Sequence, residues 1–254
     1  MKLKQIIPGA VVAIAGVAAA LLLRDTALAV TATGFQKLCY SLSLIGVVAG
    51  ITVAAAGVAP RKQVSTRKLA MAAMFAALSY IGFAYLRIDI PVGSEKTAFH
   101  LGNVFCVLAA LFLGGLWGGL SGAVGLTLAD LTSAYVTSAP KTFLLKLGIG
   151  LVTGLVAHTV LHISKEKMPR RRLLGATVAS CIAGMAFNVV ADPVVGYFYK
   201  VYVLGVPQNA ALIWAKMGAV TTLVNAVTAV AVASIAYLAL RPALEKSNLM
   251  PHVQ

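Results

Sequence analysis

Apolar stretches of about 15 to 24 residues alternate with short polar connections along almost the whole chain. One crossing of a lipid bilayer takes about 20 apolar residues in a helix. The pattern therefore predicts eight membrane-spanning helices, at residues 6–23, 38–58, 69–86, 101–115, 117–133, 143–163, 173–191 and 217–240.

One of these stretches must contain a turn. The segment from Leu101 to Ala129 has no charged residue and is too long for one helix unless that helix is strongly tilted. Six residues in its middle read GGLWGG, and glycine clusters of this kind mark turns. We expect two short helices here, joined by a tight turn.

Composition supports the same fold class. The chain is 60% hydrophobic and 11% charged, with a mean hydropathy of +0.91, whereas soluble domains are about 45–50% apolar and about 25% charged. The prediction is an all-α, polytopic integral membrane protein. The formal net charge of +14 comes from basic residues strung between apolar segments, and this scattering argues against a nucleic-acid-binding surface.

The basic residues predict the topology. Cytoplasmic connections of membrane proteins carry an excess of Lys and Arg, and 13 of the 21 basic residues fall on one side if Met1 is cytoplasmic and eight spans follow. We therefore expect a multi-pass protein of a bacterial cell membrane with both termini in the cytoplasm. On that side lie residues 1–5, 59–68, 164–172 and 241–254, together with the glycine turn.

The charge pattern also suggests a domain organisation. We expect a two-helix N-terminal membrane unit, a basic cytoplasmic linker, a six-helix bundle and a cytoplasmic tail, at residues 1–58, 59–68, 69–241 and 242–254. The first helix has a second interpretation as a cleaved signal peptide, because Ala27-Leu28-Ala29 matches a cleavage site. A long apolar run, interrupted by Arg24 and Asp25 before that site, favours an uncleaved helix.

No metal or cofactor site is expected. Cys39, Cys106 and Cys181 all lie in apolar stretches far apart in the sequence, which argues against a disulfide framework or a zinc site. His158 and His162 are four residues apart and share a helix face, but the sequence offers no third ligand near them. Interfacial histidines are the simpler interpretation.

Small residues recur every four positions. Gly114, Gly118 and Gly122 form one such series, and Gly150 and Gly154 form another. Small residues at this spacing let helix backbones approach closely in lipid. We interpret these glycines as packing positions inside the bundle.

Alanines follow the same spacing at the start of the predicted six-helix bundle, in the sequence LAMAAMFAAL. Two interpretations stay open for this helix: ordinary packing, and a docking face for a partner protein near the cytoplasmic side. The alanines concerned are Ala72, Ala73, Ala76 and Ala77.

Polar residues in or next to the apolar spans gather toward the predicted outer side. They lie at the outer ends of the later helices, in a first outer connection after the helix at 69–86 and in a second one at residues 192–216. Charged groups in spans are costly and often mark substrate paths. Asn225, alone in the last span, reads as a helix contact. The candidates for binding a solute are Asp89, His100, Asn103, Asp130, Lys146, Asn188, Asp192, Tyr197 and Lys216.

Energy for transport has no source in the sequence. There is no G-x-x-x-x-G-K-[ST] loop for a nucleoside triphosphate and no catalytic triad at credible spacing. The two halves show no clear repeat of glycine- or proline-broken helices, which would indicate a secondary transporter. A chain that recognises a solute but lacks an energy source suggests a partner that supplies one.

Two segments carry a resemblance to a known family. HLGNVFCVLAALFLGGLWGGLSGAVGLTLADL, from His100 to Leu131, and SAPKTFLLKLGIGLVTGLVAH, ending at His158, resemble the substrate-binding S components of energy-coupling factor (ECF) vitamin transporters, most closely the riboflavin branch. RKLAMAAMFAALSYIGF resembles the first helix of that family. The likeness covers about residues 66–240, and residues 1–58 lie outside it.

The resemblance implies a six-helix S-component bundle that binds a vitamin such as riboflavin, or a precursor, near its extracellular face. It implies a transmembrane coupling subunit, which meets the alanine helix, and two cytosolic ATPase subunits. The chain itself is then not an enzyme. Two alternatives remain at this point: a structural membrane subunit, and an integral-membrane enzyme acting on lipid or isoprenoid with Asp130 and Asp192 as its acid–base pair.

Overall fold

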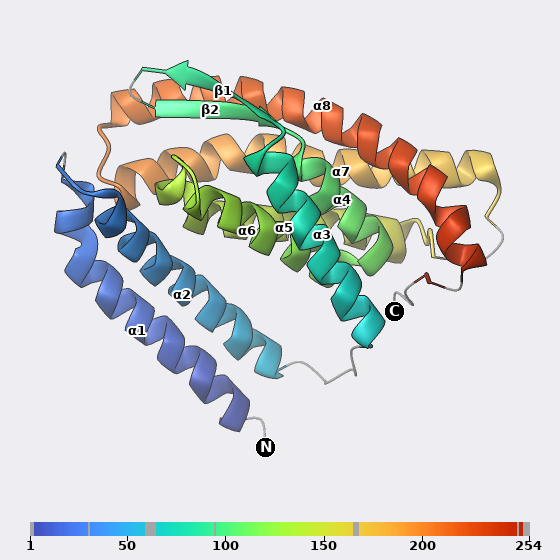
Figure 1. The fold of residues 1–254 in the computed structure, drawn as a ribbon, viewed down its shortest axis with the longest axis horizontal. Coiled ribbons are helices and arrows are strands. Elements are labelled where there is room, and N and C mark those ends of the chain that lie inside the picture. Colours follow the sequence, from blue (N-terminus) through green and yellow to red (C-terminus); the bar gives the residue numbers. More distant parts are fainter. Residues whose placement is uncertain are drawn as a thin grey trace. The chain divides into compact units, whose positions relative to one another are not determined.

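The computed structural model describes residues 3–29, 31–58, 65–93, 95–164, 168–247 and 249–250. Helices dominate, and a single two-stranded hairpin is the only sheet among these residues (Figure 1). The elements are α1 (Leu3–Leu28), α2 (Gly34–Val58), α3 (Thr66–Ala84), β1 (Arg87–Val92), β2 (Glu95–His100), α4 (Gly102–Leu113), α5 (Gly115–Leu131), η1 (Val136–Ser138), α6 (Ala139–Gly154), η2 (Leu155–Val160), α7 (Arg170–Phe198), η3 (Tyr199–Val203) and α8 (Gln208–Lys246).

The structure confirms an all-α integral membrane protein. Within the described ranges, four helical segments are long and apolar enough to cross a membrane: Ile7–Leu28, Val136–Val160, Arg170–Val203 and Gln208–Lys246. Gly34–Val48 and Gly102–Leu113 are apolar but shorter. The 12 residues of α4 rise only about 18 Å, less than the hydrocarbon core of about 30 Å.

Contacts group the chain into two compact units. Unit 1 comprises Met1–Val64 and Asp130–Leu144, and unit 2 comprises Ser65–Ala129 and Leu145–Gln254. The predicted basic linker falls mostly on residues 59–64, which lie outside the described residues, as do the last four residues of the predicted tail.

Unit 1 is built on two antiparallel helices, α1 and α2, which lie side by side (Figure 1). Glycine makes this approach possible, since a Cβ atom on Gly16 would lie 2.7 Å from the Ser43 carbonyl oxygen. Ser41 Oγ, on α2, donates a hydrogen bond of 2.7 Å to the Val136 carbonyl oxygen. The segment 130–144 is therefore attached to the N-terminal helices within this unit.

The turn at Gly114 in unit 2 is confirmed. Gly114 adopts a φ of 84°, in the region that favours glycine, and separates α4 from α5. The glycine series act as packing positions. A Cβ atom on Gly150 would clash with Gly119 Cα, and one on Gly118 would clash with Ala110 Cα. Helix α5 therefore touches α6 through one glycine series and α4 through the other.

The first predicted outer connection forms a β-hairpin and not an irregular loop. Residues 87–100 form an antiparallel hairpin, with Arg87 opposite His100 and the turn at Gly93, whose φ is 62°. The sequence RIDIPV alternates polar and apolar side chains, which is the period of a strand. Its shortness and its polar residues led us to expect only a connection.

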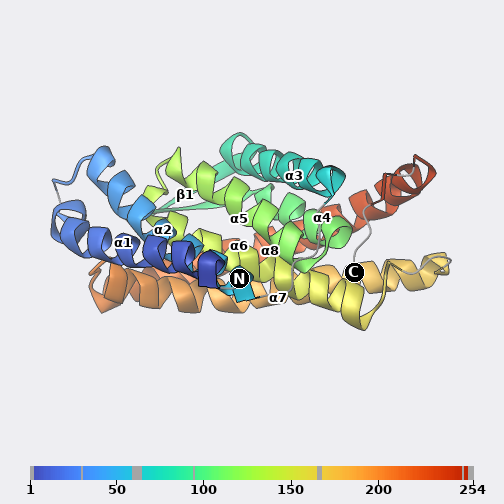
Figure 2. The same ribbon diagram turned by 90° about the horizontal axis from the view of Figure 1, so that it is seen from below.

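The expected outer connection at residues 192–216 was wrong in extent. Helix α7 and its continuation η3 run to Val203, and α8 begins at Gln208 (Figure 2). Only residues 204–207 break the helices, at Gly205 with a φ of 67° and at Pro207, which precedes the first turn of α8. The polar and aromatic residues here continue the helices beyond the apolar spans. Helix α8 likewise extends past the predicted boundary at residue 241, through Pro242.

Candidate ligand-binding site

The hairpin is fixed to α8 by polar contacts. Asn225 Oδ1 accepts a hydrogen bond of 3.0 Å from the His100 backbone N–H, and Asn225 Nδ2 donates one of 3.0 Å to the Ala98 carbonyl oxygen. The Thr97 and Thr221 hydroxyls lie 2.8 Å apart. Asn225 is therefore hydrogen-bonded, as expected, but to a strand and not to another helix. Figure 1 shows the hairpin lying along α8.

His100 stands where the hairpin meets α4. Its Nδ1 accepts a hydrogen bond of 3.2 Å from the Gly102 N–H, and its ring packs edge-on against Phe83, with ring centroids 4.7 Å apart. Burial, then the positive charge of Lys146, lowers the pKa of His100 to about 3, and the Asp192 carboxylate acts in the opposite direction. The side chain is therefore a neutral imidazole at physiological pH.

Charged side chains converge around this histidine. Lys146 is only 8% exposed, and the Asp192 carboxylate accepts a hydrogen bond of 2.8 Å from Thr222 Oγ1. Arg87, whose charge also reaches His100, forms an ion pair of 3.1 Å with Asp89. Buried charges are costly unless they are paired or serve a ligand, so charged groups gathered at one place in an apolar bundle mark a candidate site.

Two asparagine oxygens in the same region are buried without a partner. Asn103 and Asn188 are 2% and 1% exposed, and the Oδ1 atom of each has no hydrogen-bond partner among the described residues. Asn103 follows His100 by three residues, and Asn188 lies one helical turn before Asp192. An unsatisfied buried acceptor costs about 1–3 kcal/mol, and donors on a bound ligand would remove that cost.

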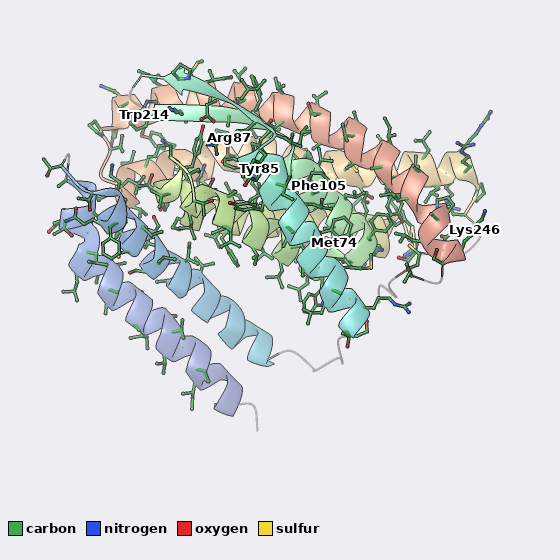
Figure 3. All side chains as sticks on the ribbon, viewed as in Figure 1. Met74, Tyr85, Arg87, Phe105, Trp214 and Lys246 are labelled. Carbon is green, nitrogen blue, oxygen red and sulfur yellow. The ribbon has the colours of Figure 1, made fainter. Side chains whose placement is uncertain are left out.

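An open hollow adjoins the cluster. It has a volume of about 320 Å³ and lies between the start of the hairpin and α8, with Arg87, His100 and Asn225 among its lining residues. Ligand pockets are about 300–1,000 Å³. Figure 3 shows Arg87 and Trp214 beside the hairpin, well away from Met74 and Lys246. The hairpin end of unit 2 is the candidate site. It consists of the hairpin with His100, Asn103, Lys146, Asn188, Asp192 and Asn225.

Three predicted site residues have other surroundings. Tyr197 packs edge-on against Phe198, with ring centroids 5.3 Å apart, and Lys216 is exposed. Asp130 belongs to unit 1, where its carboxylate accepts a hydrogen bond of 2.5 Å from Thr142 Oγ1.

Sequence reasoning missed the threonines of the site. Thr97, Thr221 and Thr222 connect the hairpin and α7 to α8, and none of them is charged or unusual in an apolar helix. A usable signal was present, because Thr221 and Thr222 precede Asn225 by four and three residues. They share its helix face, and three hydrogen-bonding side chains on one face of a membrane helix form a polar stripe.

The comparisons with known proteins point to one family. Residues 63–242 match the family described as ECF-type riboflavin transporter, S component. The chain belongs to this family. Neither the curated proteins nor the solved structures gave a match. The matched segment covers well over half of the chain and leaves α1 and α2 outside it, as the resemblance implied.

As a member of the ECF riboflavin S components, the chain is a multi-pass transport protein of the cell membrane. The family consists of transporter components and not of enzymes. The alternative of a lipid- or isoprenoid-modifying enzyme therefore loses its support, and so does that of a purely structural subunit.

The alanine helix of this S component has two different faces. Ala72 is buried and the Ala76 carbonyl oxygen lies against Gly125, whereas Ala73 and Ala77 are exposed. Successive residues of a helix are about 100° apart, so neighbouring alanines cannot face the same way. Ala72 packs inside the bundle, whereas the exposed Ala73 and Ala77 lie on the face that is open to a partner. Met74, 50% exposed, lies on the outer face (Figure 3).

His158, in η2, and His162, just after it, have protein partners. His158 Nδ1 lies 2.6 Å from Ser164 Oγ and its Nε2 lies 3.1 Å from the Ala110 carbonyl oxygen, while His162 Nδ1 lies 3.0 Å from the His158 carbonyl oxygen. Within the described ranges, no three His, Cys, Asp or Glu side chains are grouped to hold a metal ion, and all three cysteines are free thiols.

Proposed function

We propose that this S component captures riboflavin, or a closely related flavin, at the hairpin end of unit 2. The observation that carries the proposal is the pair of buried, unpartnered amide oxygens on Asn103 and Asn188. The buried Lys146, whose charge reaches His100, adds a donor to the same end. Such atoms are retained in a folded protein when something else completes their hydrogen bonds. Membership of the riboflavin family names the class of ligand.

The chemistry of a flavin suits these groups. Its ring carries a polar edge with carbonyl oxygens and an N–H group, and its side chain carries hydroxyls. We assign Lys146 to a ring or side-chain oxygen, because its ammonium group has only donors, and the two asparagine oxygens to N–H or O–H groups. Asp192 and His100 would complete the polar wall, and Phe83 supplies an aromatic surface beside His100.

The hairpin end is assigned to the extracellular side by the positive-inside rule, which puts residues 1–5, 59–68, 164–172 and 241–254 in the cytoplasm. Capture from outside then needs no nucleotide. Release to the cytoplasm needs energy, and we assign that step to a transmembrane coupling subunit and two cytosolic ATPase subunits, because this chain contains no nucleotide-binding loop.

The exposed face of α3 is the proposed contact for the coupling subunit. Ala73 and Ala77 are four residues apart and exposed, and small residues at that spacing let two helices approach closely in lipid. Ala72 and Ala76 support the bundle from the other side. The docking role that the sequence suggested for four alanines is thereby assigned to two.

Ligand binding is tested with the purified chain in detergent, without partner subunits or ATP. Titration of riboflavin, followed by quenching of flavin fluorescence, is expected to show saturable binding. Lys146→Gln should weaken binding by at least tenfold, because a charge-assisted hydrogen bond is replaced. The matched control, Lys246→Gln at the far end of α8, should bind like the wild type. A folded chain that binds no flavin would contradict the proposal.

Coupling is tested by co-purification with the coupling subunit after joint expression. Ala73→Leu combined with Ala77→Leu should abolish co-purification and spare flavin affinity, because two bulky side chains would hold the helices apart. Ala179→Leu combined with Ala239→Leu makes the same change at exposed sites on α7 and α8 and should leave the complex intact. Equal recovery of the complex from both double variants would contradict the assignment to α3.

A further inference from the structure

A long apolar groove runs between α7 and α8, outside the candidate ligand site. Its volume is about 730 Å³, and Ser234 is the only lining residue with a hydrogen-bonding side chain. That side chain is buried and donates to Cys181 Sγ at 3.5 Å, so it does not present a polar atom to a ligand. The rims are exposed, with Val227 at 64% and Ile235 at 70%.

The length and polarity of the groove suit a hydrocarbon chain. On α7 the lining extends from Leu174 to Val190, which is about 24 Å along the helix. Every lining side chain except Ser234 is apolar. An acyl chain of a membrane lipid therefore meets only groups of its own polarity along the groove.

Positive charge lies at one end of the groove. Arg170, Arg171 and Arg172 are exposed in the first turn of α7, which contains no acidic residue. Arg170 and Arg171 precede Leu174 by four and three residues and so continue the lined face of the helix beyond the groove. From Leu174 to Met185 the helix rises about 16 Å, which matches half of a hydrocarbon core of about 30 Å.

We propose that this groove binds one acyl chain of an anionic phospholipid from the cytoplasmic leaflet, whose phosphate is held by the α7 arginines. The acyl chain fills the groove from Leu174 to about Met185, and the arginines provide the charge complement that basic clusters offer to anionic headgroups. The site is separate from the flavin site, so the outcome of either test leaves the other proposal standing. It rests on the predicted cytoplasmic position of residues 164–172.

Native mass spectrometry of the purified full chain in detergent tests the proposal. Phosphatidylglycerol and phosphatidylcholine with identical acyl chains are titrated in parallel, and the fraction of lipid-bound protein gives an apparent Kd for each. We expect phosphatidylglycerol to bind at least tenfold more tightly. Equal affinity for the two lipids would overturn the role of the arginines.

Two kinds of variant separate the chain from the headgroup. Ala231→Phe fills the groove from α8 and should weaken both lipids alike, and Ala186→Phe, which fills it from α7, is the second variant if the first fails to fold. The triple variant R170Q/R171Q/R172Q should lose phosphatidylglycerol affinity by about fivefold for each arginine and keep its affinity for phosphatidylcholine.

Matched controls lie outside the groove. Ala239→Phe is an equal change on an exposed position of α8, and Lys246→Gln removes a positive charge from the same end of that helix. Both should bind lipid like the wild type. Lipid binding that survives both phenylalanine variants would overturn the proposal, as would a dimer that Ala231→Phe abolishes, because a second copy would then occupy the groove.

Discussion

The buried asparagines at one end of unit 2 and the buried arginine at the other differ in their hydrogen bonds. At the hairpin end, the Oδ1 atoms of Asn103 and Asn188 are buried without partners, beside the buried Lys146. At the other end, which we call the Arg241 end, Arg241 is also buried, but it donates 2.7 Å to the Ile163 carbonyl oxygen and pairs with Glu245 at 2.6 Å.

We interpret the hairpin end as a binding surface and the Arg241 end as a region that its own hydrogen bonds hold together. An end whose polar groups bond to one another gains stability from them and offers little to a solute. An end that leaves acceptors unsatisfied gives up stability, and donors on a bound ligand would restore it. Polar substitutions at the two ends should therefore affect different measurements, stability at the Arg241 end and affinity at the hairpin end.

Arg241→Met should have the largest effect on stability. It removes the donor to Ile163 and the contact with Tyr237, whose hydroxyl lies 3.4 Å from Arg241 Nη1, and leaves a buried carbonyl unsatisfied. We expect a loss of about 3 kcal/mol in the free energy of unfolding, measured by thermal unfolding in detergent. Flavin affinity of the folded fraction should not change.

Arg172→Met is the matched control for that substitution. Arg172 is exposed at the start of α7, so the same change there should cost less than about 0.5 kcal/mol. Similar losses in the two variants would mean that the Arg241 contacts do not hold this end together.

Asn225→Leu should come next, because it affects both measurements. The His100 N–H and the Ala98 carbonyl oxygen each lose their partner, and the hairpin is released from α8 at that point. We expect a loss of about 2 kcal/mol in the free energy of unfolding and faster dissociation of flavin in stopped-flow fluorescence. Thr228→Val, one turn along the same helix, removes only an exposed bond to its own helix and should leave the free energy of unfolding unchanged.

The hydrophobic pattern predicted the helical fold well. The length and hydropathy of a segment can be read directly from the sequence, and they are enough to predict a membrane helix. The turn at Gly114 follows from the glycines of GGLWGG, which are unfavourable inside a helix. The second outer connection, predicted at residues 192–216, was placed too early. Polar residues begin there while the chain is still helical. Tyr197 and Lys200 are polar enough to end an apolar span but compatible with a helix. Tyr197 lies in α7, and Lys200 lies in its continuation η3.

The sequence predicted individual residues of the candidate site but not how they come together. His100, Lys146 and Asp192 are recognisable one by one because ionisable groups are expensive in lipid. Their convergence depends on the hairpin and on the rotation of α7 and α8, which spacing alone does not provide. Tyr197 follows Asp192 by five residues, about 140° around the helix, so it faces away although it lies on the same turns.

Asn188→Leu sharpens the comparison because its two effects have opposite signs. Leucine is about the size of asparagine and has no acceptor to leave unsatisfied, so the free energy of unfolding should stay equal or rise by about 1 kcal/mol. Flavin affinity should fall about tenfold, which fluorescence titration measures. A loss of stability without a loss of affinity would identify Asn188 as a structural residue and remove it from the site.

The last prediction concerns pH, and it belongs to His100. Its pKa is lowered to about 3 in the folded chain, whereas an unfolded histidine titrates near 6.5. Below pH 6.5 the unfolded state therefore binds a proton that the folded state does not, and stability falls as pH falls toward 3. Between pH 7 and pH 5 we expect a loss of about 2 kcal/mol from this residue.

His100→Asn isolates that contribution. Asparagine keeps an acceptor for the Gly102 N–H but has no group that titrates in this range, so the variant should lose less stability than the wild type between pH 7 and pH 5. The difference between the two pH profiles cancels every other titrating group. Because the imidazole is already neutral at pH 7, flavin affinity of the wild type should gain nothing from His100 between pH 7 and pH 8. Parallel stability profiles would mean that the histidine becomes protonated in place, and the hairpin end would then be wetter than the buried cluster around Lys146 requires.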